Sequence, residues 1–166
     1  MILYPNDFLK SVTEISYEYL QKNDIKALIL DVDNTLIDYD RNLSPEIIEW
    51  ANGLKDKGIK MIILSNSNHK EKVEEVANKL DIKYEYFGTK PFKRGFKKVK
   101  KILNLESKNI AAVGDQIFTD IIGANRMKMY SILVEPIAEK DFFVTKIKRP
   151  IENYIKNRYK KTKEEK

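Results

Sequence analysis

The sequence predicts an α/β protein with a doubly wound, Rossmann-like parallel sheet of five strands and helices on both faces. Two observations support this fold class. Apolar runs long enough for a buried strand alternate with segments of helical periodicity, and polar residues follow the ends of several of these runs. Because neighbouring parallel strands need a helical crossover between them, this alternation favours one parallel sheet. The length of 166 residues suits one domain with a sizeable core.

Each element can be justified from its local pattern. The predicted strands are Ala27 to Asp31, Ile59 to Leu64, Ile82 to Phe87, Ile110 to Val113 and Ser131 to Val134. The spacing of apolar residues predicts one or two short helices at 6–22 and further helices at 45–57, after the polar loop 65–68, at 92–103, at 119–127 and in the C-terminal region, where a helix starts again at Pro150. Ser44 before Pro45 is a typical helix start, and Gly58 is a typical helix end.

Composition favours a soluble globular protein. No apolar run approaches the roughly 20 residues that cross a bilayer. The first residues lack the basic segment and apolar core of a signal peptide, so we expect a cytoplasmic protein, either free or peripheral at the inner face of the membrane. The absence of cysteine excludes disulfides and zinc–thiolate sites. The predicted organisation is an N-terminal helical segment packed on the core (1–26), a catalytic domain (27–149) and a basic C-terminal helix or tail (150–166).

The positive charge is concentrated at the C-terminus. Residues 1–145 hold 22 basic and 22 acidic residues, whereas 146–166 hold 9 basic and 3 acidic ones, which accounts for the net charge of +6. Three interpretations of the tail remain open: a helix docked on the core, attachment to an anionic membrane surface, or nucleic-acid binding. The third is the least favoured, because no nucleic-acid-binding motif accompanies the charge. The apolar residues near one face of this helix are Ile151, Tyr154, Ile155 and Tyr159.

Polar side chains follow four of the predicted strands. In strand order they are Asp31 and Asp33, then Ser65 and Asn66, then Lys90, and finally Asp115 and Asp120. Because the carboxyl ends of parallel strands meet at one edge, where doubly wound folds bind ligands, we expect these residues on one rim. Clustered carboxylates need a cation, and Mg²⁺ prefers oxygen ligands while keeping positions for water and phosphate. Taken singly, each residue also fits a turn, a helix cap or a solvated lysine.

The residue types fit phosphate-ester hydrolysis. Asp31 can attack phosphorus and form an aspartyl-phosphate, while Asp33 can protonate the leaving alkoxide and later deprotonate water. Ser65 and the backbone amides that follow it, including that of Asn66, can hold phosphate oxygens, and Lys90 offsets the crowding of anions. The predicted metal ligands are Asp31, Asp33, Asp115 and Asp120, the last of which completes or orients the shell.

Four segments resemble the four motifs of the haloacid dehalogenase (HAD) superfamily of phosphatases. The segments are Asp31-Val-Asp33-Asn-Thr-Leu, Leu64-Ser65-Asn66, Lys90-Pro91 and Gly114-Asp115-Gln-Ile-Phe-Thr-Asp120. The resemblance covers roughly residues 27 to 134. It implies Asp31 as nucleophile, Asp33 as general acid/base, Ser65 and Lys90 as phosphate ligands, and Asp115 as metal ligand. It also implies that Asp33 binds the metal through its backbone carbonyl, which leaves its side chain free for proton transfer.

Further segments resemble the YqeG-like, type IIIA subgroup of this superfamily, which is related to mitochondrial phosphatidylglycerophosphate (PGP) phosphatases. They are Lys10-Ser-Val12, Val113-Gly-Asp-Gln116, Thr119-Asp120, Gly123-Ala-Asn-Arg126 and Ile132-Leu-Val-Glu-Pro-Ile137. The resemblance implies dephosphorylation of PGP to phosphatidylglycerol. The alternatives are a phosphatase of a soluble ester, such as a sugar phosphate or nucleotide, and a basic RNA- or ribosome-associated binding protein on the same fold.

The spacing of the motifs leaves no room for a cap domain, which many members of the superfamily carry. Seven residues separate Leu36 from Ser44, and 24 residues separate Ser65 from Lys90. The second interval is just sufficient for one helix and one strand. We therefore expect an open site, which suits a bulky substrate such as a lipid head group.

Overall fold

A sheet of six parallel strands forms the centre of the protein. The computed structural model describes residues 1–138 and 143–164, with side chains described for 1–138 and 153–164. The strand order is β1-β6-β5-β2-β3-β4. The strands are β1 (Asp7–Leu9), β2 (Ala27–Leu30), β3 (Lys60–Leu64), β4 (Lys83–Glu85), β5 (Ile110–Gly114) and β6 (Tyr130–Val134). The predicted fold class is confirmed, with six strands rather than five.

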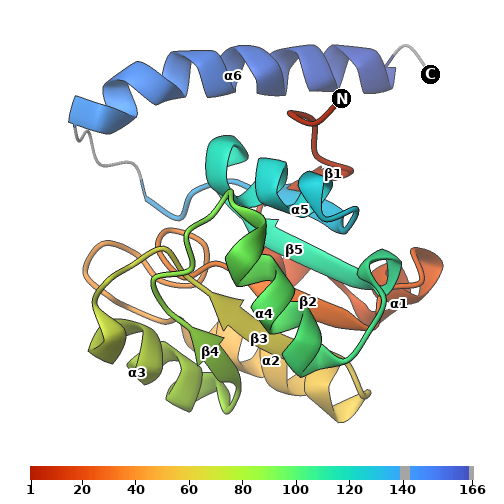
Figure 1. Ribbon diagram of the computed structural model, residues 1–166, viewed down its shortest axis with the longest axis vertical. Coiled ribbons are helices and arrows are strands. Elements are labelled where there is room, and N and C mark those ends of the chain that lie inside the picture. Colours follow the sequence, from red (N-terminus) through yellow and green to blue (C-terminus); the bar gives the residue numbers. More distant parts are fainter. Residues whose placement is uncertain (139–142, 165–166) are drawn as a thin grey trace.

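Helices connect the strands and cover both faces of the sheet (Figure 1). They are the 3-10 helices η1 (Val12–Glu14) and η2 (Ser107–Asn109), the π-helix η3 (Ile117–Ile121), and the α-helices α1 (Tyr17–Lys22), α2 (Pro45–Asp56), α3 (Lys70–Leu80), α4 (Lys93–Leu103), α5 (Ile122–Arg126) and α6 (Phe143–Glu164). Helices α2 and α3 pack on one face, whereas α4 and α5 pack on the other. From β2 the chain runs outward to β3 and β4, then crosses to β5 and β6, so the topological switch point lies between β2 and β5.

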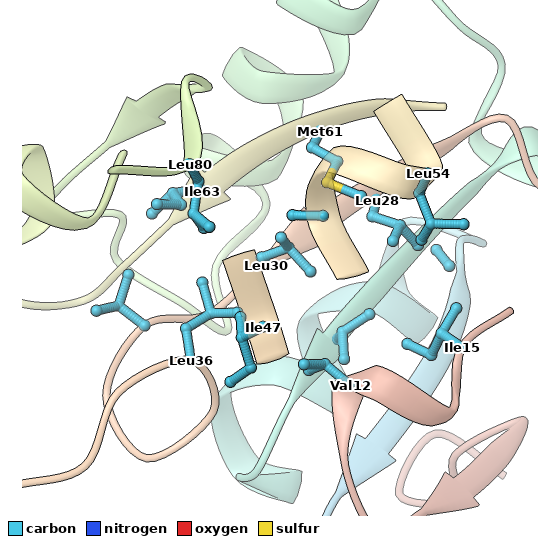
Figure 2. Close-up of a cluster of buried hydrophobic side chains, with 14 of the residues drawn as sticks. Val12, Ile15, Leu28, Leu30, Leu36, Ile47, Leu54, Met61, Ile63 and Leu80 are labelled. Carbon is cyan, nitrogen blue, oxygen red and sulfur yellow. The ribbon is translucent and has the colours of Figure 1, made fainter. Parts of the chain in front are cut away.

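The alternation of side chains along each strand divides the core into two layers. On β2, Leu28 and Leu30 face the layer of α2 and α3, whereas Ala27 and Ile29 face the layer of α4. Figure 2 shows the first layer, in which Leu28 and Leu30 meet apolar side chains of β3, α2, α3 and η1. All four β2 residues are buried, as expected for a strand covered on both faces. Asp31 therefore follows a strand that packing fixes from both sides.

The N-terminal segment differs from the prediction of helices at 6–22. Asp7–Leu9 form the edge strand β1, which pairs with β6, and helical structure begins only at η1. A strand of three residues is too short to show a period-two pattern, so tertiary contacts decide its conformation. The Asn6 side chain accepts a hydrogen bond from the Ser131 N–H on β6 at 2.9 Å, and the Tyr19 hydroxyl donates to Asp7 Oδ2 at 3.1 Å.

Two other helices begin earlier than predicted. The helix predicted at 119–127 starts with the π-helix η3, whose turn is wider than that of an α-helix, and continues as α5. The C-terminal helix α6 starts at Phe143 and runs through Pro150, so the predicted restart at Pro150 is wrong. A proline removes one backbone N–H from the helix, and this helix of 22 residues continues across that gap.

The C-terminal half of α6 is docked at the β1 edge of the sheet (Figure 1). Ile155 and Tyr159 are buried, and Ile155 packs in an apolar cluster with residues of β1, β6 and η3. The Tyr159 hydroxyl donates to the Asn6 carbonyl at 2.9 Å, whereas the Tyr154 side chain is exposed. These contacts support the docked-helix interpretation of the tail. Ile151, which the sequence places near the same helical face, lies outside the residues whose side chains are described.

The carboxyl ends of the strands carry only short connections in the described part of the chain. Between β2 and α2 there is a loop with isolated bridges joining Ile37 to Asp33 and to Leu43. Between β3 and α4 there are only α3 and β4. No domain covers the strand ends among these residues, as the motif spacing predicts. None of the described helices combines the length and the apolar character that a membrane-spanning helix requires.

Candidate active site

The centre of the candidate site is a buried lysine between two carboxylates. Lys90 donates from Nζ to Asp31 Oδ1 at 2.7 Å and to Asp120 Oδ1 at 2.6 Å, and its side chain is 3 % exposed. Asp31 follows β2, Lys90 follows β4, and Asp120 lies in η3 after β5. Three segments far apart in the sequence therefore meet at the switch point of the sheet, where the order of the strands predicts a ligand site.

Asp115 completes a group of three buried carboxylates. Carboxylate oxygens of Asp31, Asp115 and Asp120 lie within 4.8 Å of one another. The buried Thr35 hydroxyl lies 3.4 Å from Asp31 Oδ2 and 3.3 Å from Asp115 Oδ1, and it therefore joins the ends of β2 and β5. A compact, all-oxygen group of this kind fits a hard divalent cation better than a softer metal.

The group is short of positive charge. Three carboxylates face a single ammonium group, so full ionisation would leave two buried negative charges without a partner. Burial, reinforced by the charge of Asp31, raises the pKa of Asp120 to about 7. Burial and the neighbouring Asp31 and Asp120 also raise the pKa of Asp115 well above its usual value. Burial alone would lower the pKa of Lys90, but Asp120 and Asp31 outweigh it and raise that pKa. A bound cation would therefore stabilise the ionised form of these carboxylates.

Asp33 lies in a different environment from Asp31. Its side chain is 49 % exposed, and Oδ1 accepts a hydrogen bond from Lys72 Nζ on α3 at 2.6 Å. Its carboxylate is not a member of the buried trio. The side chain of Asp33 is thus accessible to a substrate, and metal binding through its backbone carbonyl stays a prediction.

Ser65 and Asn66 lie in the loop after β3. This loop holds in place the segment between β4 and α4, which carries Lys90 and is called the Lys90 loop below. The Asn66 side chain accepts from the Lys90 backbone N–H at 2.7 Å and donates to the Lys90 carbonyl at 2.9 Å. The Ser65 hydroxyl oxygen accepts from the Ser67 N–H at 3.1 Å, which leaves its own hydrogen available for a ligand. The oxygen and one hydrogen of the Asn66 side-chain amide are therefore both bonded to Lys90.

Gly114 and η3 together set the position of Asp120. A Cβ on Gly114 would overlap the carboxyl group of Asp120, so this residue of β5 must be glycine for Asp120 to fold back over the strand. Asp120 Oδ2 also accepts from the Gln116 N–H at 3.2 Å, at the start of the π-helix. π-helical turns often occur at functional sites because they re-aim a single side chain.

Asn34 links the loop after β2 to the segment after β6. Its backbone adopts a left-handed conformation with φ of 62°, which asparagine tolerates better than most residues. Its side chain donates to the Ala138 carbonyl at 2.8 Å and accepts from the Ala138 N–H at 2.9 Å. The loop that carries Asp31 and Asp33 is therefore tied to the chain that leads to α6.

The structure brings together Asp31, Lys90, Asp115 and Asp120 as the sequence predicts, with Ser65 and Asn66 in the adjoining loop. Sequence reasoning gave no role to Lys72, Thr35 or Asn34. Thr35 and Asn34 lie inside the first motif, so their position alone was a signal. Lys72 offered none, because it is one of 31 basic residues and its partner Asp33 is 39 positions away.

The chain is similar in sequence to known phosphatases. A family model described as "Mitochondrial PGP phosphatase" matches residues 2–138. A protein of Bacillus subtilis described as "Probable phosphatase YqeG" is 36 % identical over 152 residues, which cover 91 % of this chain and 88 % of that protein. "Phosphatidylglycerophosphate phosphatase 1, chloroplastic/mitochondrial" of Arabidopsis thaliana is 27 % identical over 87 % of this chain but only 45 % of its own length.

A solved structure shares the fold of this chain. The HAD phosphatase from Thermococcus onnurineus superposes with a TM-score of 0.52 at 19 % identity, over 61 % of this chain and 51 % of that protein. At this identity the likeness concerns the fold alone, whereas the family match rests on the sequence. The chain belongs to the phosphatase family whose model is described as mitochondrial PGP phosphatase.

Proposed function

We propose that this phosphatase is a Mg²⁺-dependent phosphomonoester hydrolase that works through an aspartyl-phosphate on Asp31 and converts PGP to phosphatidylglycerol. One observation carries the proposal. Asp31 is paired with Lys90 and lies in a buried group with Asp115 and Asp120, in which the carboxylates outnumber the single ammonium group. A phosphate ester brought to this group together with a divalent cation would meet a carboxylate that is already oriented.

The acidic group fits Mg²⁺. Asp31 and Asp115 would hold the ion, with the backbone carbonyl of Asp33 as a further ligand and Asp120 completing or orienting the shell. When bound, Mg²⁺ neutralises charge on the phosphate and on the carboxylates around it. The remaining chemistry belongs to side chains of the protein.

Asp31 and Asp33 divide the two chemical steps. A carboxylate oxygen of Asp31 attacks phosphorus, the bond from phosphorus to the ester oxygen breaks, and Asp33 gives its proton to the departing alkoxide. Asp33, now ionised, takes a proton from water as the water oxygen attacks the aspartyl-phosphate. Inorganic phosphate leaves and the Asp31 carboxylate is restored. The exposure of Asp33 and the burial of Asp31 suit these unlike roles.

Ser65, Asn66 and Lys90 hold the transferred phosphoryl group. The Ser65 hydroxyl and the Asn66 backbone N–H donate to phosphate oxygens, and the Lys90 ammonium group stabilises the negative charge that gathers there. Because Asn66 fixes the backbone of Lys90 through two hydrogen bonds, it also positions the lysine.

The substrate assignment rests on two supporting observations. The relative from Arabidopsis is described as a phosphatase of PGP, and the family model carries the same description. In addition, only short loops surround the strand ends in the described part of the chain, which suits a phosphate on a large lipid. The proposed location is therefore cytoplasmic, at the surface of a membrane.

The test is phosphate release from PGP in mixed detergent micelles, beside sugar phosphates, nucleotides and an aryl phosphate, with Mg²⁺ or with a chelator. We expect PGP to give the highest kcat/KM and the chelator to abolish turnover. Asp31→Asn should remove turnover of every substrate while leaving the fold intact. Full activity of this variant contradicts the nucleophile assignment, and a higher kcat/KM for a soluble ester contradicts the substrate.

A further inference from the structure

Three exposed aromatic residues lie on either side of Lys90 in the sequence. Tyr86, Phe87 and Phe92 are 39 %, 65 % and 64 % exposed, and all lie within seven positions of one another around the Lys90 loop. We call these three residues the aromatic rim. The exposed basic residues Lys93, Arg94 and Lys97 follow it on α4, and none of the three forms an ion pair within the described part of the chain.

Backbone hydrogen bonds hold the chain at Phe87 and Gly88 against the loop after β3. The Phe87 N–H donates to the Ser67 carbonyl at 2.8 Å, and the Gly88 N–H donates to the Ser65 carbonyl at 2.7 Å. The rim therefore adjoins the loop that holds phosphate in the proposed function. It also flanks Lys90 in sequence, whose ammonium group contacts Asp31.

Local stability does not explain why these residues occupy the aromatic rim and the start of α4. Phe87 adopts a left-handed backbone with φ of 52°, which is unfavourable for a bulky side chain. Phe92 occupies the N-cap of α4 without a capping hydrogen bond, and the first turn of that helix contains no acidic residue. Lys93 and Arg94 there oppose the helix dipole. Local choices that each reduce stability, grouped beside a catalytic site, indicate a functional surface.

An anionic lipid surface matches this chemistry. Aromatic side chains are favoured in the head-group region of a bilayer, and each nearby basic residue adds attraction to anionic lipids. In the part of α6 whose side chains are described, residues 153–164, Ile155 and Tyr159 are buried against the core and are not available for insertion. Stacking of single-stranded nucleic acid on the same aromatics would not explain why they border a site for phosphate monoesters.

We propose that the aromatic rim, together with Lys93, Arg94 and Lys97, docks the protein on an anionic membrane with the candidate site facing the lipid. The proposal rests on the proposed function, since it assumes a phosphate ester carried by a lipid. It assigns membrane contact to the residues around Lys90 and to the start of α4, whereas membrane attachment through the C-terminal tail was one of three interpretations that the sequence left open.

The test compares the wild type with the double variant Phe87→Asn/Phe92→Ser by flotation with vesicles of phosphatidylcholine, with and without phosphatidylglycerol. Asparagine tolerates a left-handed backbone and serine is a good N-cap, so both substitutions suit the local structure. We expect the wild type to float with the anionic vesicles and to be released by salt. The double variant should bind about tenfold more weakly, because two apolar side chains no longer reach the interface.

Three controls separate the possible outcomes. Tyr154→Ser removes an equally exposed aromatic residue from α6 and should float like the wild type. Turnover of a soluble aryl phosphate should be unchanged in the double variant. Wild-type protein that hydrolyses PGP in micelles but ignores vesicles overturns the docking surface alone, whereas vesicle binding without PGP turnover overturns the substrate alone. Equal flotation of the double variant and the wild type, or retention of a single-stranded oligonucleotide in place of vesicles, also overturns the docking surface.

Discussion

At the scale of single residues, the two aspartates that flank Val32 lie in different environments, as their proposed roles require. Asp31 is buried and paired with Lys90, whereas Asp33 is half-exposed and paired with Lys72. A nucleophile benefits from being fixed and shielded, and a proton donor must reach both the leaving group and water. In a continuing strand, residues two positions apart would share a face, but β2 ends at Leu30. Asp31 and Asp33 lie in the loop that follows, whose irregular backbone lets their side chains differ in environment.

Lys72 should act as a positioning residue for Asp33. Replacement by Met keeps an apolar stem of similar length but removes the 2.6 Å hydrogen bond to the carboxylate. We expect kcat to fall about tenfold with little change in KM, because a proton donor that is free to rotate is less often aligned. Lys79→Met is the matched control, since Lys79 lies on the same helix and pairs only with the exposed Glu75. Equal kcat values for Lys72→Met and Lys79→Met would show that Lys72 does not position Asp33.

Gly114 should be intolerant of even one methyl group. In Gly114→Ala the new Cβ overlaps the Asp120 carboxyl group, so Asp120 must leave its position beside Lys90. We expect at least about a tenfold loss of kcat and a lower melting temperature, because a buried ion pair is broken on one side. Gly53→Ala is the control: nothing lies within 4 Å of its added Cβ, and alanine in this helix should raise stability by up to about 1 kcal/mol. Activity and thermal melting of the two variants measure the difference.

At the scale of whole elements, the free energy with which α6 docks on the core can be tested by substitution of single residues. Ile155 is buried, whereas its neighbour Tyr154 is 61 % exposed on the same helix. Ile155→Ala should loosen α6 by about 2 kcal/mol, near the low end for a buried isoleucine because the site is at the periphery. Tyr154→Ala should leave α6 docked. Hydrogen exchange along α6 reports the change, and unaltered protection in Ile155→Ala would mean that the helix is held by other contacts.

The elements that the sequence predicts well are those that carry their own pattern. The buried strands β2, β3, β5 and β6, and helices α2 to α4, repeat apolar residues at a period that local packing enforces. The edge strand β1 lacks such a pattern, because its pairing with distant residues of β6 determines it. The π-helix η3 lacks one because its wider turn departs from the α-helical period. The same is true of the site. The motif residues can be recognised in the sequence, whereas the pairing of Lys72 with Asp33 becomes apparent only in the folded structure.

At the scale of the whole molecule, charge is layered around the carboxyl ends of the strands. Asp31, Asp115 and Asp120 form a buried acidic group that exceeds its lysine partner by two charges. The surface beside it carries the basic residues of α4. This arrangement keeps the centre receptive to a cation while the rim attracts anions, which is the combination that a phosphate ester bound with a metal requires.

The acidic centre should make the stability of the metal-free protein depend on pH. Asp120 has a folded-state pKa of about 7 against an ordinary value of 3.8, so the folded protein binds more protons than the unfolded chain between these values. The free energy of unfolding therefore falls as pH rises from about 4 to about 7 and then levels off, and Asp115 shifts in the same direction. We expect the metal-free protein to melt several degrees lower at pH 7.5 than at pH 5.5. The first pH lies above the folded-state pKa of Asp120, and the second lies between its folded-state and ordinary pKa values.

Mg²⁺ and Asp120→Asn test the origin of this effect. Since protons and metal compete for the same carboxylates, Mg²⁺ should raise the melting temperature more at the higher pH than at the lower one. Asp120→Asn removes one titrating group and one negative charge, so its melting temperature should depend less on pH in the absence of metal. If the variant keeps the full pH dependence, the buried carboxylates are not its source. If Mg²⁺ stabilises the wild type equally at both pH values, the ion binds elsewhere. A steep wild-type dependence that Mg²⁺ flattens would tie the charge deficit of the site to the cation that the proposed reaction needs.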